Sequence, residues 1–169
     1  MNESYDRPCA LVTGATSGIG AAFANRLAQE GFDLILHGRR QEKLAGHAKI
    51  LEKTYPISVD IIIAELSRID EIKMVEERIK SLDRLDMLIN NAGYWEPGFL
   101  WEHSPDSLEA MIMVHNVAPV RFIRAALPRM LERNKGDIIN VSSLGAYFNM
   151  VEFTGKSDQR AIPVFFNRL

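Results

Sequence analysis

Short apolar runs alternate with longer amphipathic stretches along most of this chain. The runs predict β-strands at 10–13, 33–37, 58–64, 85–89 and 137–141, and the amphipathic stretches predict helices at 19–30, 41–55, 69–81 and 107–133. Regular alternation of strand and helix is typical of a parallel sheet covered by helices. Because crossovers between parallel strands are right-handed, the pattern predicts a doubly wound parallel α/β sheet with strand order 3-2-1-4-5.

Two segments of this pattern carry more specific expectations. The run 58–64 is apolar at most positions, which predicts a strand buried on both faces. The long helix 107–133 contains Pro119 near its middle and Pro128 late, and we expect a kink at Pro119.

Length and composition fit a soluble globular protein. The 169 residues suggest one domain, with 47% hydrophobic and 25% charged residues. The net charge of −2 argues against nucleic acid as a partner. The single cysteine, Cys9, excludes an internal disulfide and indicates a reducing compartment. The four histidines show no metal-ligand spacing, so we expect no metal site.

Nothing in the sequence predicts export or membrane insertion. Residues 1–8 are polar and lack the apolar region of a secretory signal. No continuous apolar run approaches the roughly 18 residues of a membrane span. We therefore expect a cytoplasmic protein without a membrane partner.

The turn after the first predicted strand carries the strongest functional signal. Residues 11–20 read Leu-Val-Thr-Gly-Ala-Thr-Ser-Gly-Ile-Gly and lead directly into a helix. Gly14 allows a tight turn, Gly18 allows close approach to a pyrophosphate, and Gly20 allows the helix to pack on its strand. The helix N-terminus then favours a phosphate. A glycine-rich turn without a ligand is the alternative.

Three further features follow in sequence order. Asn90-Asn91-Ala92-Gly93 follows the fourth strand, Asn116 lies within the long helix, and Ser142-Ser143 ends the fifth strand. With the glycine turn, they closely resemble the short-chain dehydrogenase/reductase family over about residues 8–150. The resemblance implies a Rossmann-type sheet and hydride transfer between a nicotinamide cofactor and a small carbonyl or alcohol substrate.

The resemblance also assigns roles to residues of this chain. Ser143 matches the catalytic serine that orients the substrate oxygen, and Asn116 matches an asparagine that sustains a proton relay. A turn or capping role is the alternative for Ser143, and structural bracing alone is the alternative for Asn116. Cofactor binding is implied for thirteen residues: Gly14, Thr16, Ser17, Gly18, Ile19, Gly20, Arg39, Arg40, Glu65, Leu66, Asn91, Ala92 and Gly93.

The end of the second strand favours NADP over NAD. A carboxylate there binds the ribose 2′-hydroxyl of NAD and repels a 2′-phosphate. This chain instead has His37-Gly38-Arg39-Arg40, and arginine binds a 2′-phosphate through a charged fork. Two solvated surface arginines are the alternative. Glu65-Leu66 stands where the family often has Asp-Leu near the adenine, a mild departure.

The sequence departs from the family at its carboxyl end. The family's catalytic Tyr-x-x-x-Lys is absent, and the expected positions hold Lys156 and Arg160. We therefore divide the chain into a nucleotide-binding domain, 1–154, and an atypical tail, 155–169. The change suggests a C-terminally truncated sheet whose fifth strand is an open edge. The tail segment 162–166 could cover that edge or worsen its exposure.

These observations leave more than one function open. The resemblance implies an NADP-dependent oxidoreductase whose turnover is impaired in this chain. A non-catalytic dinucleotide-binding module and a nonfunctional fragment are the alternatives. The long helix 107–133 often joins subunits in this family, and a homodimer through Met111, Val114, Ala118 and Phe122 is expected.

Overall fold

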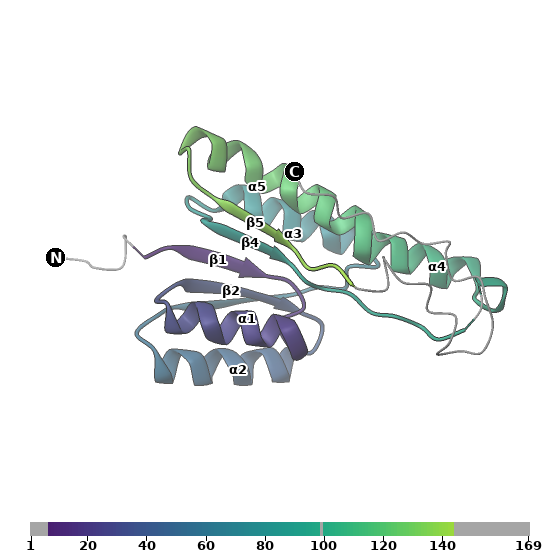
Figure 1. The fold of residues 1–169 in the computed structure, drawn as a ribbon, viewed down its shortest axis with the longest axis horizontal. Helices are drawn as coiled ribbons and strands as arrows, with labels where there is room; N and C mark the ends of the chain where they lie inside the picture. The colour runs from purple at the N-terminus through teal and green to yellow at the C-terminus, as the bar shows by residue number, and fades with distance from the viewer. Residues whose placement is uncertain (1–6, 99, 144–169) are drawn as a thin grey trace.

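The computed structural model describes residues 7–98 and 100–143, which form a five-stranded parallel sheet between two helical layers (Figure 1). The order β3-β2-β1-β4-β5 confirms the predicted doubly wound, Rossmann-type topology. The strands are β1 Cys9–Val12, β2 Asp33–Gly38, β3 Val59–Ile63, β4 Met87–Asn90 and β5 Asp137–Asn140.

Helices cover both faces of the sheet. One layer contains α1 (Gly18–Gln29) and α2 (Gln41–Thr54), and the other contains α3 (Ile69–Ser81) and α5 (Ala118–Glu132) (Figure 1). Successive strand residues point to opposite layers. Ala10 and Val12 of β1 pack with the α1 and α2 side chains, whereas Leu11 packs with α3 and α5. The apolar runs thus supply two cores, one on each face.

The expectation that β3 is buried on both faces is wrong. β3 pairs only with β2 among the described strands and forms one edge of the sheet. Asp60 is exposed and Ile63 is 36% exposed, while Ile62 is buried. The run of isoleucines reflects the preference of β-branched residues for strands rather than double burial.

The long helix is interrupted earlier than predicted. α4 spans Pro105–Ile112, a π-helical turn spans Met113–Val117, and α5 follows. The Ala118 N–H donates to the Met113 carbonyl, five residues back. Pro119 has no N–H to donate to the carbonyl four residues before it, so the distortion falls in the preceding turn. Pro128 lies inside α5.

The apolar face expected to join two subunits belongs to the core. The four side chains of this face are at most 9% exposed and pack in the hydrophobic core between the sheet and the layer of α3 and α5. They are Met111, Val114, Ala118 and Phe122. Those side chains are therefore not available to a second subunit. The exposed apolar side chains of α5 are Val120, Leu127 and Leu131.

The 28-residue stretch Pro105–Glu132 is long and apolar enough to cross a membrane by length and composition alone. The search for continuous apolar runs missed it, because the stretch includes interspersed charges such as Arg121 and Arg124. Residues buried inside the protein make up 39% of the most apolar part of this stretch, and core helices of globular proteins can also reach this length and apolar composition.

The C-terminal expectations concern residues outside the described ranges. The domain boundary at 154, the tail 155–169 and the covering segment 162–166 all stay predictions. Within the described residues, β5 pairs with β4 alone.

Candidate cofactor and active site

A cavity of about 440 Å³ opens where the carboxyl ends of β1, β2, β3 and β4 meet one another. This edge is where open α/β sheets bind ligands. The residues predicted to bind a cofactor all line it except Gly20: Gly14, Thr16, Ser17, Gly18, Ile19, Arg39, Arg40, Glu65, Leu66, Asn91, Ala92 and Gly93.

The glycine turn between β1 and α1 requires glycine for two different reasons. Gly14 and Gly18 have φ of +68° and +58°, a left-handed conformation that favours glycine. A Cβ on Gly14 would also lie 2.8 Å from the Ala92 Cα, whereas one on Gly18 would face open space. A Cβ on Gly20 would lie 2.4 Å from the Asn91 side-chain nitrogen, so Gly20 supports the turn from behind the cavity.

The start of α1 completes an anion-binding arrangement. The first turn of α1 contains no acidic residue, and its N-terminus begins at Gly18 on the cavity wall. The positive end of the helix dipole favours a phosphate there. The open space beside Gly18 is the room that a pyrophosphate requires.

Thr13 and Asn91 fasten the glycine turn to the end of β4. The Thr13 hydroxyl accepts the Asn91 and Ala92 N–H groups at 2.9 and 3.0 Å. The Asn91 amide donates to the Thr13 and Gly14 carbonyls at 2.8 and 3.3 Å. Sequence reasoning did not single out Thr13, although a threonine directly before the turn was a visible signal.

His37 was also missed, and it joins the glycine turn to β3. Its ring is 2% exposed, accepts the Gly14 N–H on Nδ1 at 3.4 Å, and donates from Nε2 to the Ala64 carbonyl at 3.1 Å. These partners require the neutral Nε2–H tautomer. Burial lowers the pKa of His37 to about 4, so the ring is uncharged at neutral pH.

Two arginines reach over the cavity from the end of β2. Arg40 donates from Nη2 to the Thr16 and Ser17 hydroxyls at 2.8 and 3.0 Å. Arg39 pairs with Glu65 at 3.0 Å and is 62% exposed. Arg40 thus lies beside the hydroxyls of the glycine turn, Arg39 lies beside Glu65, and both arginines line the cavity.

Gly38 stands where an NAD-binding protein would have a carboxylate, and the structure leaves no room for a side chain there. A Cβ on Gly38 would lie 2.6 Å from the Thr16 methyl group. A side chain at position 38 would therefore have to displace Thr16.

A second cavity of about 190 Å³ adjoins the first and shares Ile19, Asn91, Ala92 and Gly93 with it. Ser143 lines this cavity with Ser142, His115 and Pro119. Asn116 is half-buried in the π-helical turn and is not part of the lining of either cavity. Ser143 and Asn116, the two residues expected to be catalytic, therefore lie on different elements, and His115, which directly precedes Asn116 in the chain, lines the second cavity.

His115 fixes the backbone after the Asn-Asn-Ala-Gly segment. Its Nε2 lies 2.7 Å from the Tyr94 carbonyl oxygen and 3.2 Å from the Tyr94 nitrogen. The ring also occupies the space beside Gly93, where a Cβ would lie 2.6 Å from its Cε1. Sequence reasoning assigned His115 no role at this site.

Asn90 joins the ends of β4 and β5 below the second cavity. Its amide donates to the Asn140 side-chain oxygen at 2.9 Å. Asn90 is 3% exposed, and its side-chain oxygen has no hydrogen-bond partner within the described part of the chain. Lys156 and Arg160, which stand where the tyrosine and lysine are expected, lie outside the described residues.

No group of His, Cys, Asp and Glu within residues 7–98 and 100–143 could hold a metal ion. The glycine turn, the helix N-terminus and the two arginines instead define a dinucleotide-binding α/β protein. The chain belongs to the short-chain dehydrogenase family, since the family model described as short chain dehydrogenase matches residues 8–155.

Curated relatives are similar to this chain over most of its length. The very-long-chain 3-oxoacyl-CoA reductase-A of Danio rerio is 39% identical over 164 residues, which are 94% of this chain and 51% of the relative. The human inactive hydroxysteroid dehydrogenase-like protein 1 is 40% identical over 137 residues, which are 79% of this chain and 41% of the relative. The chain thus spans about half the length of the curated relatives it matches.

Solved structures show the same fold. A short-chain dehydrogenase from Sphingobium yanoikuyae in complex with NADPH is 33% identical, with a TM-score of 0.82 over 87% of this chain and 57% of that one. A metagenomic short-chain oxidoreductase in complex with NADP is 35% identical, with a TM-score of 0.75 over 82% of this chain and 63% of that one.

Proposed function

We propose that this chain binds NADP(H) and derives from an oxidoreductase that interconverts a carbonyl and an alcohol. The observation that carries the proposal is the first cavity, whose rim holds Arg39 and Arg40 and has Gly38 where a carboxylate would favour NAD. NADP(H) complexes among the similar solved structures support the choice of cofactor.

The residues of the first cavity fit such a cofactor. The backbone at Gly14 and Gly18 and the N-terminus of α1 would hold the pyrophosphate. Arg39 and Arg40 would hold the 2′-phosphate, and Leu66 would lie beside the adenine. The bound cofactor would supply or accept the hydride.

The second cavity would place the substrate. The Ser143 hydroxyl would donate to the carbonyl oxygen or accept from the alcohol, and Asn116 would support a proton relay. Reduction of a carbonyl also needs a proton at its oxygen, which the family's tyrosine donates. Because the sequence contains no Tyr-x-x-x-Lys, we propose that turnover is severely impaired.

A non-catalytic dinucleotide-binding module is the second candidate. It needs the first cavity but no tyrosine. The human relative whose name describes it as inactive, at 40% identity, favours this candidate. A nonfunctional fragment would instead bind no nucleotide.

For partners and location, we propose a small carbonyl or alcohol substrate, no nucleic acid and no membrane, in the cytoplasm. The buried face of α5 supports a role for this helix in the core of a globular domain. A homodimer would form through the exposed side chains Val120, Leu127 and Leu131.

Titration of the purified chain with NADPH, and separately with NADH, tests the proposal. We expect saturable NADPH binding that raises the melting temperature, and weaker NADH binding. Carbonyl-reduction assays on the NADPH-bound chain then separate a slow enzyme from a binding module. Binding of neither nucleotide would contradict both candidates and support a fragment.

A further inference from the structure

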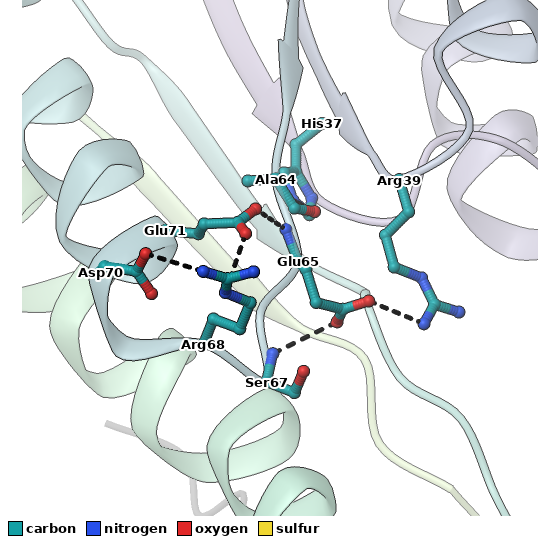
Figure 2. A network of polar contacts seen from close by, with 8 residues as sticks. All are labelled: His37, Arg39, Ala64, Glu65, Ser67, Arg68, Asp70 and Glu71. Atoms are coloured by element: carbon teal, nitrogen blue, oxygen red, sulfur yellow. Dashed lines mark hydrogen bonds and ion pairs between the residues drawn. The ribbon is translucent and has the colours of Figure 1, made fainter.

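One of the two arginines at the rim of the first cavity already forms an ion pair with a carboxylate of this chain. The Glu65 Oε2 atom accepts from Arg39 Nη1 at 3.0 Å, so the pair joins the ends of β2 and β3 (Figure 2). Glu65 is 31% exposed and Arg39 is 62% exposed, and both side chains line the cavity.

Neighbouring groups hold the Glu65 carboxylate in this position. Its Oε1 accepts the Ser67 N–H at 3.2 Å, and the Glu65 N–H donates to Glu71 at 2.6 Å (Figure 2). Glu71 is itself paired with Arg68 at 3.2 Å. The carboxylate is thus oriented by its own segment and by the first turn of α3, which lowers the conformational entropy lost in pairing with Arg39.

The charge of this carboxylate persists at neutral pH. Partial burial raises its pKa, but hydrogen bonds from Arg39 and Ser67 outweigh burial and hold the pKa below its usual value. Glu65 therefore presents a full negative charge to Arg39.

We propose that Glu65 is a specificity-determining residue that competes with the cofactor 2′-phosphate for Arg39. This inference rests on the proposed function. A 2′-phosphate and a carboxylate both bind a guanidinium through charged oxygens, so NADP(H) must displace Glu65 from Arg39. NAD(H) carries a hydroxyl in place of the 2′-phosphate, so it can bind without displacing Glu65 from Arg39. Glu65 thus reduces the preference for NADP(H) that the two arginines create.

The size of the effect follows from the exposure of the pair. A half-exposed ion pair changes an equilibrium by up to about fivefold. We expect Glu65→Gln to bind 2′-phosphorylated ligands about fivefold more tightly. Ligands without the phosphate should bind as before.

Isothermal titration of the full chain with 2′,5′-ADP and with 5′-AMP measures this difference without any need for turnover. Glu30→Gln is the matched control, since it removes the same charge from an exposed ion pair with Arg26 on α1, away from the cavity. We expect Glu65→Gln alone to strengthen 2′,5′-ADP binding. An unchanged or weaker affinity, or an equal gain for 5′-AMP, would overturn the proposal.

The Arg39→Ala background tests whether Arg39 mediates the effect. If Glu65 competes for Arg39, most of the gain from Glu65→Gln disappears when Arg39 is absent. A gain that persists in full would reveal simple repulsion of the phosphate and overturn competition. Melting curves of each variant confirm that the fold is retained.

The same titrations separate this inference from the function on which it rests. Wild-type chain that binds neither 2′,5′-ADP nor NADPH overturns both. Wild-type chain that binds 2′,5′-ADP more tightly than 5′-AMP, with no response to Glu65→Gln, overturns only the role of Glu65.

Discussion

The two adjoining cavities share a wall but differ in how they are built. The first is held by contacts between sequence-distant elements, such as the Thr13 hydroxyl against the Asn91 backbone and His37 between Gly14 and Ala64. The second ends at Ser142 and Ser143, which are exposed at the end of β5. The given sequence contains no Tyr-x-x-x-Lys, the motif that the family resemblance led us to expect after Ser143.

This difference assigns binding and chemistry to different parts of the chain. The first cavity is formed almost entirely by residues before position 95, with Val114 the exception. Under the proposed function, the dinucleotide would therefore depend on residues 14–94 and Val114, and the chemistry on groups that come later in the sequence. Loss of the close packing at the glycine turn should abolish NADPH binding, loss of an arginine at the rim of the first cavity should weaken it, and changes in the second cavity should leave it intact.

The largest effect should come from Gly20→Ala. The added methyl group would lie 2.4 Å from both the Asn91 nitrogen and the Gly14 carbonyl oxygen, so α1 must move away from the turn. We expect a loss of about 3 kcal/mol in unfolding free energy and no detectable NADPH binding. Denaturant melts and cofactor titration measure the two losses.

Gly46→Ala on α2 is the control, because an added Cβ there has no neighbour within 4 Å. This change should stabilise the protein by about 0.5–1 kcal/mol through helix propensity. Equal destabilisation by both changes would show that the close approach at Gly20 is not what constrains the turn.

Acid should lower the unfolding free energy of the protein because His37, which braces the glycine turn, becomes protonated. Burial lowers the pKa of His37 in the folded protein to about 4, below its usual value of 6.5, so the unfolded chain binds this proton more readily. Stability due to neutral His37 therefore falls as pH drops from about 6.5 through 4, by about 3 kcal/mol. Unfolding free energies at pH 7 and pH 4 measure it.

His37→Gln separates this effect from other acid-sensitive groups. Glutamine keeps a donor and an acceptor but does not titrate. Burial raises the pKa of Asp86, but hydrogen bonds from the Cys9 N–H and from Arg84 outweigh burial and hold this pKa below its usual value. The contribution of Asp86 to stability is therefore lost mainly below about pH 4, and equally in both proteins. The wild type should therefore lose more stability than the variant over this pH range. Parallel losses would show that His37 is not the titrating group.

The sequence predicted the sheet but not its internal bracing. Short apolar runs and the glycine turn are local signals, and together with the family resemblance they predicted the strand order and twelve of the residues that line the first cavity. The roles of Thr13 and His37 depend on partners more than 20 residues away, which no local pattern reveals.

Burial was the other property that the sequence pattern predicted poorly. β3 looked fully buried but forms an edge, and Met111 and Phe122 looked available but lie in the core. Apolar side chains report a preference for burial, whereas the packing of distant elements decides which face is covered. The π-helical turn likewise arises because Pro119 lacks the backbone N–H that an α-helix would use. The distortion therefore falls in the turn before Pro119 and not at the proline.

Arg39→Ala should lower affinity for NADPH without affecting NADH. Loss of a charge-assisted contact to the 2′-phosphate costs about 2 kcal/mol, or about 30-fold in affinity. Arg26→Ala, which removes an exposed, ion-paired arginine from α1, is the control. Equal losses for NADPH and NADH would place Arg39 against a part of the cofactor that both nucleotides share.

The smallest effect should come from Ser143→Ala. Ser143 lines the second cavity and not the first, so under the proposed function its hydroxyl would place the substrate rather than bind the dinucleotide. We expect the dissociation constant for NADPH to change by less than about twofold. A loss comparable with that of Arg39→Ala would show that the second cavity helps to hold the cofactor. The separation of binding from chemistry would then be wrong.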